Sequence, residues 1–180
     1  MSRSDVRLSP AMPRYPHLWL PMLRRYLLFV SGGNLVWEML HLPLYTLWQH
    51  GTAGELIFAA AHCTGGDILI ALSSLVLALV LIGGGAWPEQ RYKAVAALTI
   101  LFGFGYTVFS EWLNTAVRAS WAYSELMPVI PVVDLGLSPL AQWVVIPLAG
   151  FWWGRPSAPG RRPSVAAPLP PTPDRRENHV

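Results

Sequence analysis

Four polar side chains recur at helical spacing inside the first long apolar stretch of this chain. Asn34, Glu38, His41 and Tyr45 follow one another at intervals of four, three and four residues. Side chains three or four positions apart lie on the same face of a helix, so we expect these four to form one stripe. A carboxylate next to an imidazole can donate and accept a proton, as general acid and base catalysis requires.

A second polar stripe is predicted before residue 120. Glu111, Asn114, Arg118 and Trp121 are spaced by three, four and three residues, and Trp112 lies next to Glu111. This spacing again indicates one face of a helix. The alternative to a functional role is structural: Arg118 neutralises Glu111 as an ion pair, or extends its charged end toward the membrane surface.

A third apolar stretch carries His62 and Asp67 on either side of the pair Gly65 and Gly66. Glycine pairs are a recognised cause of helix kinks, so we predict a kinked or broken helix here. Asp67 would then either cap the second part of the helix through its carboxylate or contribute to a site.

The ionisable groups of the three stretches are predicted to lie at similar depths in the membrane and therefore close together. An ionisable group in a bilayer costs about 2.5 kcal/mol or more, which makes each one a functional candidate. At 1.5 Å per residue, Glu38, His41, His62, Asp67 and Glu111 lie about 14 to 25 Å above the cytoplasmic edge of a core about 30 Å thick. We therefore predict one polar pocket in the outer half of the membrane. Its catalytic residues are Glu38, His41, Asp67, Glu111 and Asn114, and its substrate-binding residues are Asn34, Tyr45, His62, Trp112, Arg118 and Trp121.

The composition indicates a membrane protein around this pocket. Of the 180 residues, 53% are hydrophobic and 13% are charged, whereas soluble domains carry about 25% charged residues. The apolar residues fall in blocks near the roughly 20 residues that span a bilayer. We predict an all-α integral membrane protein, a four-transmembrane-helix bundle with an ordered or re-entrant loop before the last helix. The predicted spans are about 26–48, 56–86, 94–118 and 137–153.

The positive charges predict the orientation of this four-helix membrane domain, which covers 26–153. Twelve of the thirteen Lys and Arg residues fall on one side of the predicted spans, and Arg118 is the exception. The positive-inside rule makes that side cytoplasmic. We expect a multi-pass protein of the inner (plasma) membrane with both termini in the cytoplasm. Segment 1–25 is predicted as a cytoplasmic tail with an interfacial end, and 154–180 as a disordered cytoplasmic tail rich in proline and arginine.

Two function classes are excluded by simple counts. Cys63 is the single cysteine, so the chain has neither an internal disulfide nor a cysteine-pair redox relay. The net charge of +3 follows from membrane topology, because the basic patches interleaved with aromatic residues that bind nucleic acid are missing. The expected partners are the lipid bilayer and a hydrophobic small molecule.

The chemistry that suits the pocket is acid and base catalysis on a hydrophobic lipid or isoprenoid, of the isomerase, cyclase or hydratase type. Aromatic faces would stabilise a cationic intermediate. In architecture the chain resembles the membrane sterol-isomerase class, which also gathers Glu, His, Asn and Trp inside a small helical bundle. This resemblance implies proton transfer to and from a double bond, and it rests on architecture rather than on a shared motif.

Two alternatives remain open from the sequence. Glu38 and His41 have the i, i+3 spacing of di-iron bundles, although those use the motif twice. A single ion held by His41, His62 and a carboxylate, or a haem between the two histidines, would also fit, so the cofactor is unknown at this point. The second alternative is not enzymatic: an accessory or transport subunit whose buried charges complete an interface with another membrane protein or a second copy.

Overall fold

The computed structural model describes residues 19–155, so most of the two predicted tails lies outside the described residues. Of the described residues, 77% are helical. The helices are α1 (Trp19–His41), the short α2 (Leu47–His50), α3 (Ala53–Ala78), α4 (Tyr92–Trp112) and α5 (Leu137–Gly154). Three short turns continue α1, α3 and α4: the 3-10 turn Leu42–Leu44 and the π-helical turns Leu79–Gly83 and Leu113–Val117.

Three of these helices, taken with the turns that extend them, are long and apolar enough to cross a bilayer. They cover Trp19–Leu44, Ala53–Gly83 and Tyr92–Val117. The helical content and these three helices confirm the prediction of an all-α membrane protein at this level. The predicted fourth span corresponds to α5, which has 18 residues and is not one of the three.

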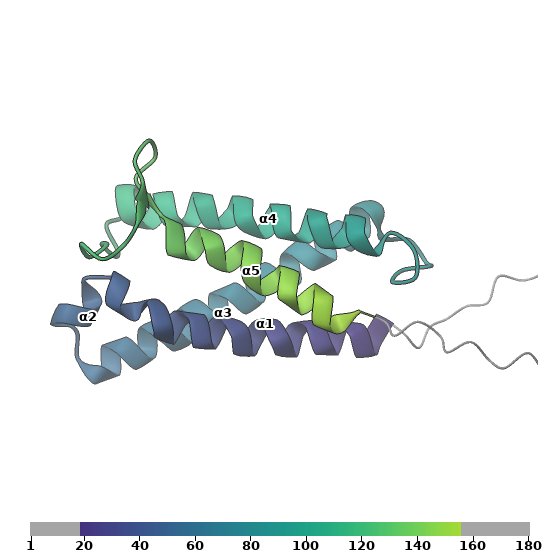
Figure 1. The fold of residues 1–180 in the computed structure, drawn as a ribbon, viewed down its shortest axis with the longest axis horizontal. Helices are drawn as coiled ribbons and strands as arrows, with labels where there is room; N and C mark the ends of the chain where they lie inside the picture. The colour runs from purple at the N-terminus through teal and green to yellow at the C-terminus, as the bar shows by residue number, and fades with distance from the viewer. Residues whose placement is uncertain (1–18, 156–180) are drawn as a thin grey trace, which may run out of the picture.

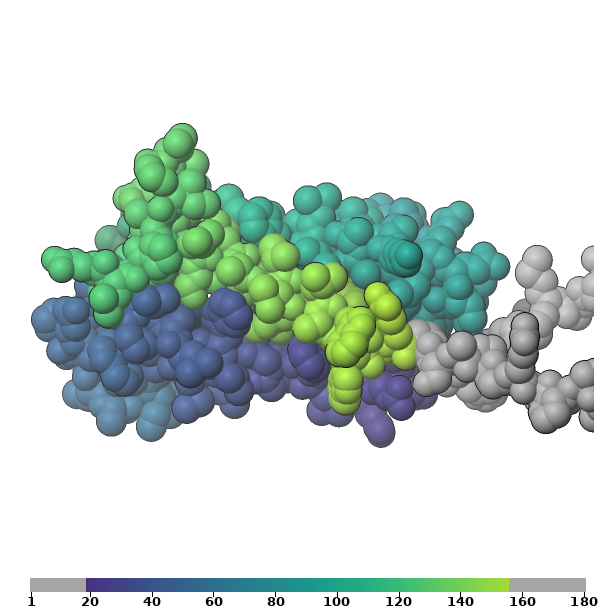
Figure 2. Space-filling model, viewed as in Figure 1, coloured from purple at the N-terminus to yellow at the C-terminus, as the bar shows by residue number. Residues whose placement is uncertain are grey.

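The four long helices run in alternating directions (Figure 1). The start of α1, the start of α4 and the end of α5 lie at one end of the molecule, while α2 and the segment that precedes α5 lie at the other. α5 packs against α1 and α4, and α3 packs against the same two helices. The space-filling view shows α5 lying between α1 and α4 on one face (Figure 2).

The first helix differs from its predicted bounds of 26–48, because α1 begins and ends earlier, at Trp19 and His41. The basic pair Arg24 and Arg25 suggested an interfacial stretch. In the structure both side chains are exposed, on the side of α1 away from the buried positions at 22, 26 and 30. The helix therefore contains the arginines without burying their charge.

The helix is not broken at Gly65 and Gly66, which was one form of the prediction, because α3 is one continuous α-helix through both glycines. A glycine in a helix costs about 1 kcal/mol relative to alanine. Breaking the helix in lipid would instead leave backbone groups without hydrogen-bond partners, which costs several kcal/mol each. Consequently Asp67 is not a helix cap. The helix begins at a capping box in which Thr52 and Glu55 satisfy each other's backbone N–H groups.

Polar side chains gather in the interior of the bundle, whereas its outward faces are apolar. Exposed leucine, valine and phenylalanine side chains cover the outward faces of α1, α3, α4 and α5. An apolar core around Tyr26, Leu75 and Phe151 fills the end where α1 begins. Toward the other end of α1, buried polar residues take over, among them Asn34 and Glu38. Such a distribution is the one expected when the surrounding solvent is hydrocarbon.

The segment 118–136, between the last turn of α4 and α5, is attached to the end of α1. It contains the antiparallel hairpin of β1 (Val129–Ile130) and β2 (Leu135–Gly136). The backbone N–H of Thr46 donates to Ala122 O at 3.0 Å, and that of Ser124 donates to Leu44 O at 2.9 Å. The space-filling view shows the segment 118–136 lying over the blue region that follows α1 (Figure 2).

Candidate functional site

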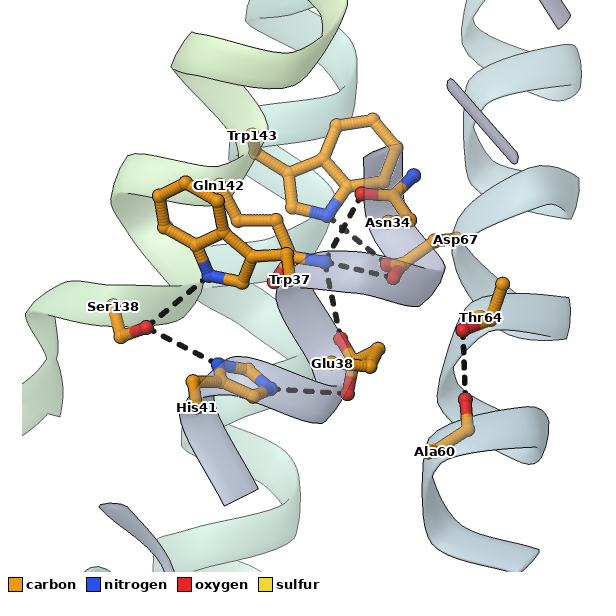
Figure 3. Close-up of polar contacts among 10 residues, drawn as sticks. All are labelled: Asn34, Trp37, Glu38, His41, Ala60, Thr64, Asp67, Ser138, Gln142 and Trp143. Carbon is orange, nitrogen blue, oxygen red and sulfur yellow. Dashed lines mark hydrogen bonds and ion pairs between the residues drawn. The ribbon is translucent and has the colours of Figure 1, made fainter. Parts of the chain in front are cut away.

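A single side-chain amide stands at the centre of the polar interior (Figure 3). Gln142 of α5 is only 2% exposed. Its Nε2 lies 3.0 Å from each of three acceptors: Oδ1 of Asn34, Oε1 of Glu38 and Oδ2 of Asp67. An amide nitrogen carries two hydrogens, so three acceptors compete for two donors. The Gln142 amide can therefore donate to two of these three acceptors at a time.

Helix α3 enters this network through Asp67. Besides Gln142, its carboxylate faces Trp143, whose Nε1–H donates to Oδ1 at 3.3 Å. The indole of Trp143 lies so close to α4 that a Cβ atom built on Gly103 would stand 2.3 Å from its ring. Only glycine fits at this position, because real Cβ atoms essentially never approach another heavy atom so closely. Gly103 therefore holds Trp143 at the distance from which it can reach Asp67.

A linear set of hydrogen bonds continues from the network toward the end of the bundle. Oε2 of Glu38 lies 3.0 Å from Nε2 of His41, and Nδ1 of His41 lies 3.1 Å from Oγ of Ser138. Trp37 Nε1–H donates to the same Oγ at 3.2 Å. The sequence stripe on α1 is thus joined to α5 at two points, through Gln142 and through Ser138.

One assignment of the hydrogens that fits this set keeps His41 neutral. An indole N–H can only donate, so Trp37 occupies a lone pair of Ser138 and the hydroxyl proton is free to point at His41 Nδ1. His41 then carries its own proton on Nε2, which donates to the Glu38 carboxylate. In this tautomer the serine hydroxyl faces an imidazole nitrogen that can accept its proton.

Two buried carboxyl groups meet at this point without a cationic side chain from Lys or Arg. Glu38 and Asp67 are both within 3.0 Å of the same nitrogen of Gln142. Among residues 19–155, the one salt bridge joins His41 to Glu38. Two like charges in a low-dielectric interior repel strongly, and the amide nitrogen of Gln142 is the donor that both carboxyl groups share.

An open cleft of about 260 Å³ adjoins the linear set of hydrogen bonds. It is lined by Trp37, Leu40, His41, Leu44 and Ser138. Leu40 is 75% exposed at its rim, so the cleft opens on the outer surface of α1. His41 and Ser138 belong to the lining of this cleft, and its exposed surface is almost entirely apolar.

A second buried polar group ties the segment 118–136 to α4 and α5. Tyr123 donates its hydroxyl to Oε2 of Glu111 at 2.5 Å and accepts the backbone N–H of Gly136 at 3.0 Å. Burial, and after it the hydrogen bond to Glu111, raises the pKa of Tyr123 far above its usual value of 10.0, which keeps the hydroxyl protonated. The ring of Tyr45 lies between His41 and Tyr123, at centroid distances of 5.3 and 5.6 Å.

The structure brings some of the predicted site residues together. Asn34, Glu38, His41 and Asp67 share the network around Gln142. Glu111 belongs to the second polar group, and Tyr45 lies between the two.

Other predicted residues lie elsewhere. His62 is exposed and stacks on Phe58 at 5.4 Å. Trp112 is 49% exposed. Arg118 follows the π-helical turn Leu113–Val117, is exposed, and forms no ion pair with Glu111 in the described part of the chain. Asn114 bonds to Ser110 one turn earlier in its own helix. The indole N–H of Trp121 is buried without a partner among residues 19–155.

The sequence prediction missed four participants, namely Ser138, Gln142, Trp143 and Tyr123. All four are uncharged, and a search for ionisable groups passes over them. One signal was present: Ser138 and Gln142 are four residues apart in the last apolar stretch, which places them on the same helix face. Gln142 is also the sole side-chain amide of α5.

The metal hypotheses find no ligand set in the part of the chain that the structure describes. No group of three or more His, Cys, Asp and Glu residues is arranged there to hold an ion. His62 is exposed and stacks on Phe58, whereas His41 is buried.

No protein-family profile, no curated protein and no solved structure matches this chain.

Proposed function

We propose that this protein is a membrane-embedded enzyme that uses the Glu38 and His41 pair as acid and base on a hydrophobic small molecule. One observation carries the proposal: the hydrogen-bonded set from Ser138 through His41 to Glu38 ends at an open cleft. A purely structural network would be expected to close on itself. Here the imidazole both receives support from a buried carboxylate and faces a space where a substrate can bind.

The surroundings of His41 favour proton transfer. The imidazole is buried, and its Nε2 is held by Glu38 at 3.0 Å, so its orientation is set before a substrate arrives. Positioned acids and bases contribute roughly 100-fold to 10,000-fold to a rate. The Gln142 amide joins Glu38 to a second buried carboxyl group, Asp67. Protonation and deprotonation of a lipid or isoprenoid double bond, in an isomerase, cyclase or hydratase, is one reaction type within reach of such a pair.

The substrate reaches this site from the bilayer. Leu40 and Leu44 line the cleft together with the indole of Trp37, and neither contributes a charge. The outer face of α1 around the cleft is apolar, with Val36 and Met39 exposed. A hydrophobic molecule dissolved in the membrane can therefore enter without crossing water. The π face of Trp37 suits a cationic intermediate.

In this proposal α5 is the fourth membrane span. Its 18 residues extend about 27 Å at 1.5 Å per residue, close to the thickness of the hydrocarbon core. Val144, Val145 and Leu148 are exposed on its outer face, as lipid contact would require. The segment 118–136 then caps the same end of the bundle as the cleft.

The orientation is cytoplasmic at the end where α1 begins. Five of the six Lys and Arg residues within 19–155 lie there, namely Arg24, Arg25, Arg91, Lys93 and Arg155. By the positive-inside rule this end lies on the cytoplasmic side. The membrane in this proposal is the inner (plasma) membrane of the cell. The cleft then lies toward the outer leaflet.

The test begins with native mass spectrometry of the full chain extracted gently from its own membrane. We expect a retained lipid-soluble molecule, which identifies the substrate class. That molecule is then added to proteoliposomes in heavy water, and both its conversion and its deuterium content are followed. The wild type should convert the molecule or exchange its protons, and Glu38→Gln should slow this by roughly 100-fold or more.

Glu125→Gln is the matched control, because Glu125 is exposed in the segment 118–136 and carries the same substitution. It should behave as the wild type. A native complex with another membrane protein, an empty cleft and a Glu38→Gln variant that only loses thermal stability would overturn the proposal. That result would identify an accessory or transport subunit instead.

A further inference from the structure

We infer that Ser138 is a nucleophile and that the reaction at this site is acyl transfer from a neutral hydrophobic ester. The inference rests on the proposed function, because it uses His41 and Glu38 as the base and its support. A serine becomes nucleophilic when a base lies within hydrogen-bond reach and a third group orients that base. Ser138, His41 and Glu38 meet this description at 3.1 and 3.0 Å.

The order of the imidazole nitrogens differs from the familiar serine hydrolases, in which Nε2 faces the serine and Nδ1 faces the acid. Here Nδ1 faces Ser138 and Nε2 faces Glu38. In a neutral imidazole either nitrogen can be the acceptor, depending on which one carries the proton. A catalytic triad is defined by its geometry and by the role of each residue, so the reversed order can serve the same chemistry. The reversed arrangement follows from the placement of Glu38 one turn before His41 on the same helix.

Ser138 also lies where a developing negative charge is favoured. It is the second residue of α5. Its backbone N–H therefore has no hydrogen-bond acceptor within the helix. The preceding residue, Leu137, donates its N–H to Pro128 O at 2.7 Å, and the following Pro139 has none. The N-terminus of an α-helix carries a partial positive charge, which would stabilise the oxyanion of a tetrahedral intermediate.

The reaction needs no group beyond these three and the substrates. Oγ of Ser138 adds to the ester carbonyl carbon while its proton passes to Nδ1 of His41. The bond to the leaving alcohol then breaks, and His41 returns the proton to the alcohol oxygen, which leaves an acyl-serine. Water or a second alcohol loses a proton to His41 as it attacks the acyl carbon, and Ser138 leaves with that proton. Glu38 holds the imidazolium throughout.

The cleft specifies the substrate class. Its lining is apolar except for His41 and Ser138, and it contains no Lys or Arg side chain. An anionic headgroup would find no partner there, whereas an alkyl chain next to a carbonyl group would pack against Leu40, Leu44 and Trp37. The ester is therefore expected to be neutral and to carry a long apolar chain.

A long-chain alkyl fluorophosphonate tests the inference directly, because an activated serine displaces its fluoride and keeps the phosphonate. The full-length protein in detergent micelles is treated with this probe and examined by intact mass and peptide mapping. We expect one adduct on Ser138 that is absent from Ser138→Ala and forms at least about 100-fold more slowly in His41→Ala. Ser73→Ala is the matched control, since Ser73 is exposed and its hydroxyl bonds only to Leu69 O.

A second variant keeps the inference testable if the Ser138→Ala protein does not fold. Ser138→Cys keeps a side chain of similar size, and with p-nitrophenyl dodecanoate it should accumulate a thioester that increases the intact mass by one dodecanoyl group. Absence of both the phosphonate adduct and this thioester overturns the inference.

The outcomes separate this inference from the function on which it rests. If Ser138→Ala converts the retained molecule at the wild-type rate while Glu38→Gln does not, the acid and base enzyme stands and Ser138 is not its nucleophile. If both variants convert it at the wild-type rate, both proposals fail.

Discussion

The contact between α1 and α5 has two halves of different chemistry. Near the start of α1, the ring of Tyr26 packs on Phe151 at a centroid distance of 4.3 Å, and a Cβ on Gly150 would lie 3.2 Å from Tyr26. Near the end of α1, Asn34 and Glu38 meet Gln142 through hydrogen bonds. The first half we call the apolar half and the second the polar half. One helix pair thus combines close packing with a polar network.

The comparison shows what holds helices together when lipid surrounds them. Hydrocarbon removes the hydrophobic drive between helices, so small residues and close packing bring the backbones together. The apolar half depends on shape alone, and the buried hydroxyl of Tyr26 has no hydrogen-bond partner among the described residues. The polar half depends on the number of hydrogens available, because each acceptor left without one costs about 1 to 3 kcal/mol. The two halves should therefore respond differently to substitution.

The largest effect is expected in the polar half from Gln142→Leu. The change removes the donor that Asn34, Glu38 and Asp67 share. The Asn34 oxygen then loses its partner, and each carboxyl group keeps one donor, from His41 or Trp143. We expect a loss of roughly 3 to 5 kcal/mol in the free energy of unfolding, comparable to breaking a buried ion pair. Thermal unfolding in detergent, followed by circular dichroism, measures it. An unchanged midpoint would show that water reaches these acceptors.

A smaller loss is expected where α4 meets the polar half. Gly103→Ala places a methyl group in the ring of Trp143, which must move away from Asp67, and overpacking of this kind costs about 1 to 3 kcal/mol. The matched control is Gly105→Ala two residues later, where a Cβ meets nothing within 4 Å. The control should be as stable as the wild type or slightly more so. Equal midpoints for the two variants would contradict the close packing of Trp143 on α4.

The smallest effect is expected in the apolar half from Gly150→Ala. The new Cβ would lie 3.2 to 3.4 Å from Tyr26, Val30 and Phe29, close enough to push α1 and α5 apart by a few tenths of an ångström. We expect a loss of about 1 kcal/mol, read from the same thermal unfolding, with the reaction rate unchanged. Gly32→Ala, which meets no atom within 4 Å, should show no loss. A fall in rate with Gly150→Ala would mean that the two halves are mechanically coupled.

Helical spacing predicted the polar stripe of α1 because a bilayer leaves few reasons to bury a charge. Asn34, Glu38 and His41 are buried on one face of α1 as predicted, and Asp67 joins them. The same reasoning could not find Gln142 or Ser138, since a neutral amide or hydroxyl in an apolar stretch has too low a cost to stand out. Which helices meet at a given depth depends on tertiary packing, which spacing along one helix does not contain.

Two errors of the sequence analysis share a physical origin. The Arg24 and Arg25 pair suggested the edge of a span, and Gly65 with Gly66 suggested a break. In both places the backbone stays helical, because a helix in lipid satisfies its own backbone hydrogen bonds wherever it can. Residue types indicate only the preference of each position. The need to pair every backbone N–H and C=O group in lipid applies to the helix as a whole. His62 is exposed for a similar reason. The orientation of α3 about its own axis buries Asp67, and this leaves His62 on an outward face.

The distribution of polar and apolar residues has a consequence for how this protein changes over evolutionary time. Leu, Ile, Val and Phe on the outward faces meet only fluid hydrocarbon, which distinguishes little among them, so these positions are free to interchange. The interior positions are tied to partners on other helices and must change together or not at all. Distant relatives should therefore share little overall identity and still keep one recognisable spacing, Asn-x3-Glu-x2-His in the first helix with Ser-x3-Gln-Trp in the last.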